Sequence, residues 1–339
     1  MDEKEFIEYL KCGLGRAVTF LRAADSVERE KYRAAVLDCC THNYSYDAQC
    51  EGTRPVYKYE LATCFDDPEY FISAVIAALD KADDDTDWQF KSLVDFLCVA
   101  ACNLHPKLAK PALESKYALV YDMLINQPKR RKRRAVVDNT AEHYECLCIA
   151  LCETDGMDGF IKVASDLGRL FGVSDYDADW FGWVLLFCED KFGKDFVRER
   201  LTAESENNKY VAAYLASVNE TIKQVTPPLP AERGVRKKIK ESFDDERLKA
   251  VLDTVDNDGV TDPDDRHGLC LDILEACDAG KAVPFAALEY VYYSRCGICR
   301  CSAVKLMAER GILPDELARE CLYDADTGLR AFVAGLNVN

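Results

Sequence analysis

Closely spaced cysteines are the first residues in this chain whose type and spacing suggest chemistry. Cys296, Cys299 and Cys301 lie within a stretch of six residues, and cysteine thiolates are common zinc ligands. A tetrahedral zinc site also needs a second cysteine pair or histidines, yet the nearest histidine in the sequence is His267. On a helix, Cys301 lies well away from the face that carries the other two cysteines. We therefore expect small buried side chains at these positions and no bound metal.

An acidic segment, residues 256–265, has part of the pattern of a calcium-binding loop. When Gly259 is aligned with the invariant glycine of an EF-hand loop, Thr254 takes the first ligand position. The last position then falls on Asp265, where an EF-hand has a bidentate glutamate, and Pro263 interrupts the segment. A solvated loop that caps the next helix explains these residues better. The sequence therefore predicts no cofactor.

A polar and aromatic segment, residues 44–57, separates two predicted helices. Long loops between helices often carry function. Asp47 or Glu51 can serve as a general base there, and Arg54 can bind an anion. The alternative is that these charged groups pair with one another and fix the loop. Asp47, Glu51 and Arg54 are therefore candidate binding residues.

Six consecutive cations form the most strongly basic run of the chain. They are Lys129, Arg130, Arg131, Lys132, Arg133 and Arg134. Such a run can bind phosphate or an acidic protein surface, or act as a nuclear localisation signal. It can also be an exposed helix start, although cations oppose the helix dipole at that end. The six residues are therefore candidate binding residues, and residues 233–240 form a second, looser basic cluster.

The sequence lacks the motifs of several well-known enzyme classes. It contains no P-loop, no G-x-S-x-G and no H-E-x-x-H. Its only histidines are His42, His105, His143 and His267. No catalytic residue is therefore assigned, and whether the protein is an enzyme stays open.

Charge and composition restrict the partners that this chain can bind. The net charge is −17, from 43 basic and 60 acidic residues, which opposes nonspecific binding to nucleic acid or anionic membranes. No apolar run approaches the ~20 residues that span a bilayer, and the acidic first residues do not resemble a signal peptide. We expect a soluble, cytoplasmic protein whose seventeen cysteines are mostly reduced.

The hydrophobic pattern predicts helices along most of the chain. Apolar residues recur with the helical period, and alternating β-branched runs are few. Predicted helices include residues 9–21, 28–40, 178–192 and 205–224. Asp25 and Glu28 have capping-box spacing ahead of the second of these helices.

A proline-rich segment suggests how the chain is divided. Residues 226–230 contain three prolines and cannot be helical. We therefore predict an N-terminal helical region, a linker and a C-terminal helical region, over residues 1–225, 226–233 and 234–339.

The C-terminal region contains a short repeat. Its first copy recurs thirty residues later, as Arg300-x-x-Ala303-x-x-Leu306 and Arg330-x-x-Val333-x-x-Leu336. In HEAT repeats an Asp opens the turn and an Arg about four residues later points back towards it. Asp326 and Arg330 match that arrangement, whereas the earlier copy has Cys296 in the Asp position. Residues 284–337 thus resemble HEAT repeats of the armadillo type.

The resemblance implies an all-α fold, in which antiparallel helical hairpins stack as a HEAT-like α-solenoid, and a scaffold or binding role. We therefore expect a non-catalytic protein that engages a macromolecular partner through an extended helical surface. The net charge favours a protein partner over nucleic acid, and no membrane partner is expected. Two alternatives stay open: an enzyme that uses residues 44–57, and a HEAT-like nucleic-acid-binding protein that uses residues 129–134.

Overall fold

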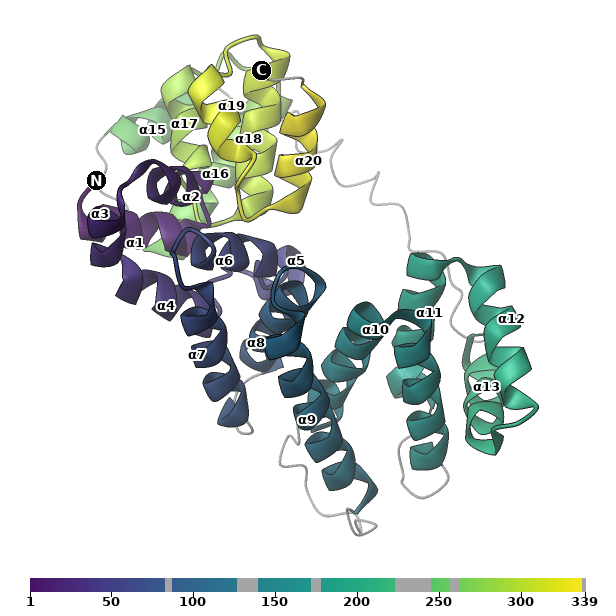
Figure 1. Cartoon of the computed structure of the whole chain (residues 1–339). Helices are drawn as coiled ribbons and strands as arrows, with labels where there is room; N and C mark the ends of the chain where they lie inside the picture. Colours follow the sequence, from purple (N-terminus) through teal and green to yellow (C-terminus); the bar gives the residue numbers. More distant parts are fainter. Residues whose placement is uncertain (83–86, 127–139, 172–177, 223–244, 257–261, 337–339) are drawn as a thin grey trace, which may run out of the picture. The chain divides into compact units, whose positions relative to one another are not determined.

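The computed structural model describes residues 1–82, 87–126, 140–171, 178–222, 245–256 and 262–336. Every regular element within these ranges is a helix (Figure 1). The prediction of an all-α fold is confirmed for this part of the chain. No helix there is both long enough and apolar enough to cross a membrane.

The chain forms two compact units, one of which is discontinuous in sequence. Unit 1 combines Met1–Pro68 with Leu229–Asn339, and unit 2 is Glu69–Pro228. The predicted division differs, because it assigned residues 1–68 to the same region as unit 2. The predicted linker, residues 226–233, lies outside the described residues.

Both segments of unit 1 contribute to one apolar core cluster. Its helices are α1 (Glu3–Cys12), α2 (Gly15–Ala23), α3 (Ser26–Lys31), α4 (Arg33–Thr41), α5 (Ala48–Glu51), α6 (Pro55–Ala62), α15 (Asp245–Asp256), α16 (Pro263–Asp278), α17 (Phe285–Tyr292), α18 (Gly297–Glu309), α19 (Asp315–Cys321) and α20 (Thr327–Gly335). Cys12 and Leu14 from the N-terminal segment pack with Val291, Val304 and Leu329 from the C-terminal segment. This shared core explains why residues 1–68 do not group with the helices that follow them.

The single helix predicted over residues 9–21 is wrong. Gly13 divides that stretch into α1 and α2, with a left-handed φ of 77°. Its N–H donates to the carbonyls of Tyr9 and Leu10, which is how a glycine commonly ends a helix. A Cβ at Gly13 would also lie 2.5 Å from the Cβ of Ala325, so close packing favours glycine here.

The cap predicted at Asp25 is confirmed. Its side chain accepts a hydrogen bond of 2.8 Å from the N–H of Glu28. The helix predicted over residues 28–40 is instead two helices, α3 and α4, which meet at Tyr32. The Tyr32 side chain is buried against Phe6 and Phe20, which places this junction in the core.

Unit 2 is a succession of longer helices. They are α7 (Pro68–Asp80), α8 (Asp87–Cys102), α9 (Pro106–Ile125), α10 (Thr140–Phe171), α11 (Ala178–Phe192), α12 (Lys194–Ser205) and α13 (Lys209–Ile222). Helix α12 occupies residues that the predicted helices 178–192 and 205–224 leave between them. The backbone of α10 is non-helical at Gly156, so α10 consists of two consecutive helices.

Helices α8 to α13 pack against their neighbours in sequence, and α10 packs most extensively on α13. Extensive contacts join α8 with α9, α9 with α10, α10 with α11, and α12 with α13, and α10 also packs on α8 and α13. Between α9 and α10, the Tyr144 hydroxyl donates to the Tyr117 hydroxyl at 2.7 Å. The Tyr117 hydroxyl in turn donates to Asp166 at 3.0 Å. These bonds satisfy the two phenols, which burial would otherwise leave unpaired.

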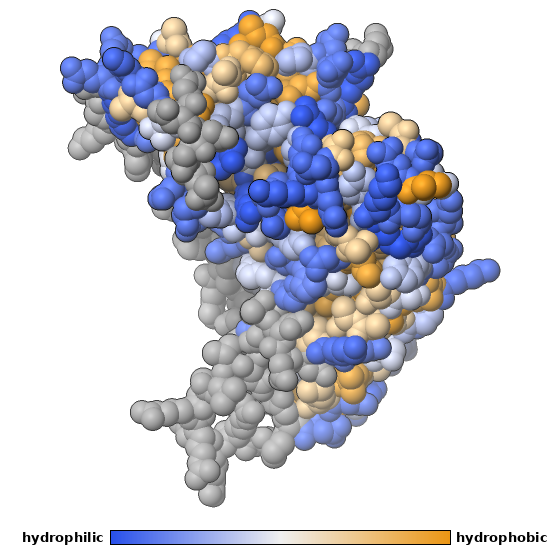
Figure 2. Space-filling model, turned by 90° about the vertical axis from the view of Figure 1, so that its left-hand side faces the viewer, coloured by the Kyte–Doolittle hydropathy of each residue, from blue (hydrophilic) through white to orange (hydrophobic). Residues whose placement is uncertain are grey.

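Most cysteines belong to these cores. All seventeen are free thiols, and all but Cys50, Cys102 and Cys146 are buried. They act as small apolar residues between closely packed helices. On the face of the molecule in Figure 2, hydrophobic residues lie in small areas among hydrophilic ones.

Candidate functional site

One group of metal-ligating side chains stands out among the described residues. The ligand atoms of His267, Cys296 and Cys299 all lie within 4.8 Å of one another. We call these three residues the His–Cys–Cys cluster. It lies in unit 1, where the N-terminal parts of α16 and α18 meet.

The start of α16 positions the histidine. Pro263 occupies the first turn, and the Asp262 side chain caps the helix by accepting from the N–H groups of Asp264 and Asp265. His267 follows in the next turn and is half-buried. A histidine on the first turns of a well-capped helix has a fixed backbone from which to reach a ligand.

Tyr46 orients the His267 ring. The Tyr46 hydroxyl donates to the Asp264 carboxylate at 2.7 Å and lies 3.4 Å from His267 Nδ1. Since this hydroxyl gives its proton to Asp264, its oxygen can accept a hydrogen bond from His267 Nδ1–H. That tautomer leaves the lone pair of His267 Nε2 available to a ligand.

The start of α18 positions the two thiols. Cys296 is the N-cap residue of α18, and Cys299 lies in its first turn. Glu51 of α5 accepts a hydrogen bond from the N–H of Gly297 at 3.1 Å. Both thiols are buried at the N-terminus of this helix.

The two thiols are electrostatically unlike. A hydrogen bond from the Cys299 thiol, aided by the Cys299 backbone N–H, lowers the pKa of Cys296 to about 6. The same thiol–thiol bond raises the pKa of Cys299, and burial raises it further. Cys296 is therefore the member of the pair that more readily becomes a thiolate, the form that binds metals and reacts as a nucleophile.

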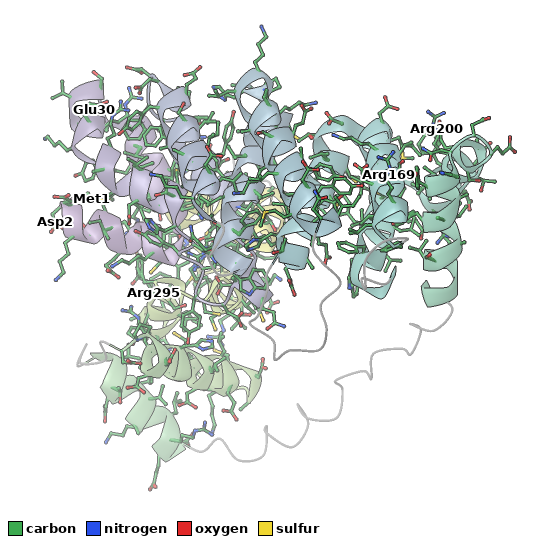
Figure 3. The ribbon with its side chains drawn as sticks, turned by 90° about the horizontal axis from the view of Figure 1, so that it is seen from below. Met1, Asp2, Glu30, Arg169, Arg200 and Arg295 are labelled. Carbon is green, nitrogen blue, oxygen red and sulfur yellow. The ribbon has the colours of Figure 1, made fainter. Side chains whose placement is uncertain are left out.

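A small cavity adjoins the cluster. Its volume is about 70 Å³, enough for a few water molecules. Its lining includes His267, Cys296, Arg266, Arg295 and Glu8. Arg295, labelled in Figure 3, reaches from the C-terminal segment to Glu8 of α1, with Nη2 at 3.2 Å from Oε2.

The charged residues predicted in the 44–57 loop lie beside this cluster, and they bind protein groups. The Arg54 guanidinium donates to Glu51 at 2.8 Å, to the Lys11 carbonyl at 2.8 Å and to the Arg295 carbonyl at 3.0 Å. Both members of the Glu51–Arg54 pair are buried. Asp47 caps α5 by accepting from the N–H groups of its second and third residues. These contacts match the alternative in which the charged groups fix the loop.

A fully buried ion pair lies next to the cluster. Arg300, one residue after Cys299, donates to both carboxylate oxygens of Asp324, at 2.7 and 3.2 Å. Its remaining terminal nitrogen donates to the carbonyls of Ser294 and Arg295, each at 3.1 Å. This guanidinium therefore fastens the turn that presents Cys296.

Several residues that the sequence suggested as functional are not part of this site. Lys129 to Arg134 and the second basic cluster lie outside the described residues, as does the centre of the acidic 256–265 segment. Cys301 is buried but is not a member of the His–Cys–Cys cluster.

The proximity of His267 to the cysteine pair was not predicted, and it removes the main argument against a metal there. His267 is distant in sequence, and nothing in the spacing of residues 263–300 shows that α16 and α18 pack together.

Comparisons of the chain with protein-family models, curated proteins and solved structures give no match.

Proposed function

We propose that this protein is a non-catalytic binding protein built from HEAT-like helical hairpins, and that it engages a protein partner through exposed helical faces. The observation that carries the proposal is the packing of unit 2, where α8 to α13 pack on their neighbours in sequence and α10 also packs extensively on α13. A succession of helices packed in this way leaves long outer faces available to a partner.

The two copies of the C-terminal repeat support the HEAT-like part of the proposal. Arg330 donates to the carbonyls of Tyr323 and Asp324 in the turn before α20. Arg300 donates in the same way to carbonyls in the turn before α18. Asp326 caps α20, as the resemblance implies, with a bond of 2.6 Å from the N–H of Leu329.

Exposed apolar side chains on unit 2 support a protein partner. Leu119 and Met123 on α9 are 49% and 43% exposed, and they lie one helical turn apart. Trp183 and Leu186 on α11 are 60% and 37% exposed with similar spacing. Large apolar groups paired on one side of a helix are typical contacts for another protein.

The contacts of the 44–57 loop argue against the enzyme alternative. A general base must reach a substrate proton. The Glu51 carboxylate is buried and already accepts from Arg54 and Gly297. An anion-binding arginine needs open donors, and Arg54 gives its hydrogen bonds to Glu51 and two backbone carbonyls. Glu51 and Arg54 are therefore better explained as structural residues.

A capture experiment with matched variants tests the proposal. The tagged protein, Trp183→Ala with Leu186→Ala, and a control with Leu271→Ala are incubated with extract of the source cells, and retained proteins are quantified by mass spectrometry. Leu271 is 50% exposed but lies on α16 of unit 1. We expect a partner that the wild type and the control retain and the double variant loses. Equal retention by all three, or none by the wild type, contradicts the proposal.

The basic run provides a test of the nucleic-acid alternative. Arg130, Arg131, Arg133 and Arg134 are changed to Glu, and capture is repeated after nuclease treatment. A protein partner held by charge should associate more slowly with this variant and more weakly as salt is raised, while folding is unchanged. If nuclease removes every captured component, the nucleic-acid alternative replaces the proposed function.

A further inference from the structure

The donor atoms of the His–Cys–Cys cluster are a typical zinc ligand set. Zinc prefers thiolate sulfur and imidazole nitrogen, and structural sites usually combine four of them. The three ligand atoms lie within 4.8 Å of one another, and they come from two separate helices. Bonds of about 2.3 Å to sulfur and 2.0–2.1 Å to nitrogen place tetrahedral ligands roughly 3.5 Å apart. Small side-chain rotations would therefore bring these atoms into zinc geometry.

The surroundings of the cluster match those of a metal site. A metal-bound histidine usually donates its second ring N–H to a neighbouring oxygen, which fixes the ring. Here the Tyr46 hydroxyl lies 3.4 Å from His267 Nδ1 and is itself held by Asp264. The Cys296–Cys299 spacing at the start of α18 keeps both thiols on one side of that helix.

Cys50 is a further candidate for a fourth ligand. It lies on α5, next to Glu51. Cys50 is exposed, so its side chain can turn towards the cluster. Helix α5 is held beside α18 by the bond from the N–H of Gly297 to Glu51.

We propose that His267, Cys296 and Cys299 bind one zinc ion, and that Cys50 completes a closed four-ligand site. The ligands come from α5, α16 and α18, so the ion would join the N-terminal segment of unit 1 to its C-terminal segment. Such a site is structural, because no coordination position remains for a substrate. Zinc binding releases the protons of the thiols and requires no oxidant or reductant.

Metal content tests the proposal directly, and Cys301 provides the control. The full chain is purified under reducing conditions without chelators, and its zinc content is measured by inductively coupled plasma mass spectrometry. We expect about one zinc per chain in the wild type and in Cys301→Ser, a cysteine from the same segment but outside the cluster. Cys296→Ser and Cys299→Ser should lose the metal.

A cobalt titration makes the test independent of whether the variants fold. Metal-free wild-type protein is titrated with Co²⁺, and a tetrahedral thiolate site should give strong visible absorption that zinc then removes. The proposal is overturned if folded wild-type protein binds neither ion. It is also overturned if alkylation and mass analysis of freshly purified protein show Cys296 and Cys299 joined in a disulfide.

The zinc affinity of Cys50→Ser tests the fourth ligand separately. Loss of an outer-shell partner typically weakens metal binding 10–100-fold, so loss of a direct ligand should cost at least about tenfold. Cys50→Ser should therefore bind zinc at least about tenfold more weakly than wild type. Unchanged affinity in this variant would overturn the fourth ligand and leave a three-residue site open to the 70 Å³ cavity.

Discussion

Replacing Arg300 with methionine should destabilise unit 1 strongly. Arg300 and Asp324 both have 0% side-chain exposure, and two hydrogen bonds join them. Arg300→Met removes the cation and leaves the Asp324 carboxylate buried, with the N–H of Asp326 as a remaining donor at 2.9 Å. It also removes the donor to the carbonyls of Ser294 and Arg295.

The expected loss follows from these contacts. Breaking a buried ion pair by removing one partner costs about 3–5 kcal/mol. The buried Ser294 carbonyl, which loses its donor, adds roughly 1 kcal/mol or more. The Arg295 carbonyl adds less, because it still accepts from Arg54 at 3.0 Å. We therefore expect Arg300→Met to lower the free energy of unfolding of unit 1 by at least about 4 kcal/mol. Asp324→Asn should cost less, because the asparagine can still accept from Arg300.

Urea unfolding followed by circular dichroism measures the effect, and each of the two units is fitted as its own transition. Arg247→Met is the matched control. Arg247 pairs with Asp272 and Glu275 of α16, but its side chain is 40% exposed, so its loss should cost under about 1 kcal/mol. The double variant Arg300→Met with Asp324→Asn should be more stable than the sum of the single effects predicts. If Arg300→Met costs no more than Arg247→Met, the buried pair does not stabilise the turn and this reasoning fails.

Two further predictions concern unit 2. Burial and the nearby charge of Glu142 raise the pKa of Glu145 to about 7. The stability that this group contributes is present below its ordinary pKa of 4.5 and is lost as the pH rises through 7. Glu145→Gln should therefore stabilise the protein by about 1–2 kcal/mol at pH 8 and hardly at pH 5, because the partial exposure of Glu145 reduces the full effect. Urea titrations at the two pH values measure this difference. Equal effects at both pH values would contradict the prediction. Gly168→Ala should lower the free energy of unfolding by about 3 kcal/mol, because the new Cβ would lie 1.8 Å from the Tyr210 carbonyl oxygen of α13. Gly182→Ala is the control: no atom lies within 4 Å of a Cβ added there, so this variant should be neutral or slightly stabilised. Both variants are compared with wild type by calorimetry, and similar melting temperatures for the two would refute the packing argument.

The sequence predicts local features of this fold well and long-range ones poorly. The helical period and the cap at Asp25 depend on neighbouring residues, and both are present in the structure. The break at Gly13 was missed because the apolar pattern continues through it, although a glycine with a left-handed φ ends the helix. The packing of residues 1–68 on the C-terminal segment depends on which apolar faces meet, and no local pattern encodes that.

The same limit applies to the candidate site. The sequence identifies Cys296 and Cys299 as a spaced pair. It also identifies Asp47, Glu51 and Arg54 as the charged residues of one loop. It does not predict their convergence, because His267 is brought to the pair only by the packing of α16 on α18. The bond from the N–H of Gly297 to Glu51 likewise joins residues far apart in the chain.

The discontinuous unit 1 has a consequence for synthesis on the ribosome. Residues 1–68 emerge before unit 2, but the helices that complete their core begin with α15 at residue 245, after all of unit 2. At roughly 5–20 residues per second, the first segment waits on the order of 10–40 s for its partner. During that interval the apolar side chains of Leu14 and Cys12 lack the core that later buries them. A nascent chain stalled before α15 should therefore contain a folded unit 2 and an N-terminal segment that depends on chaperones.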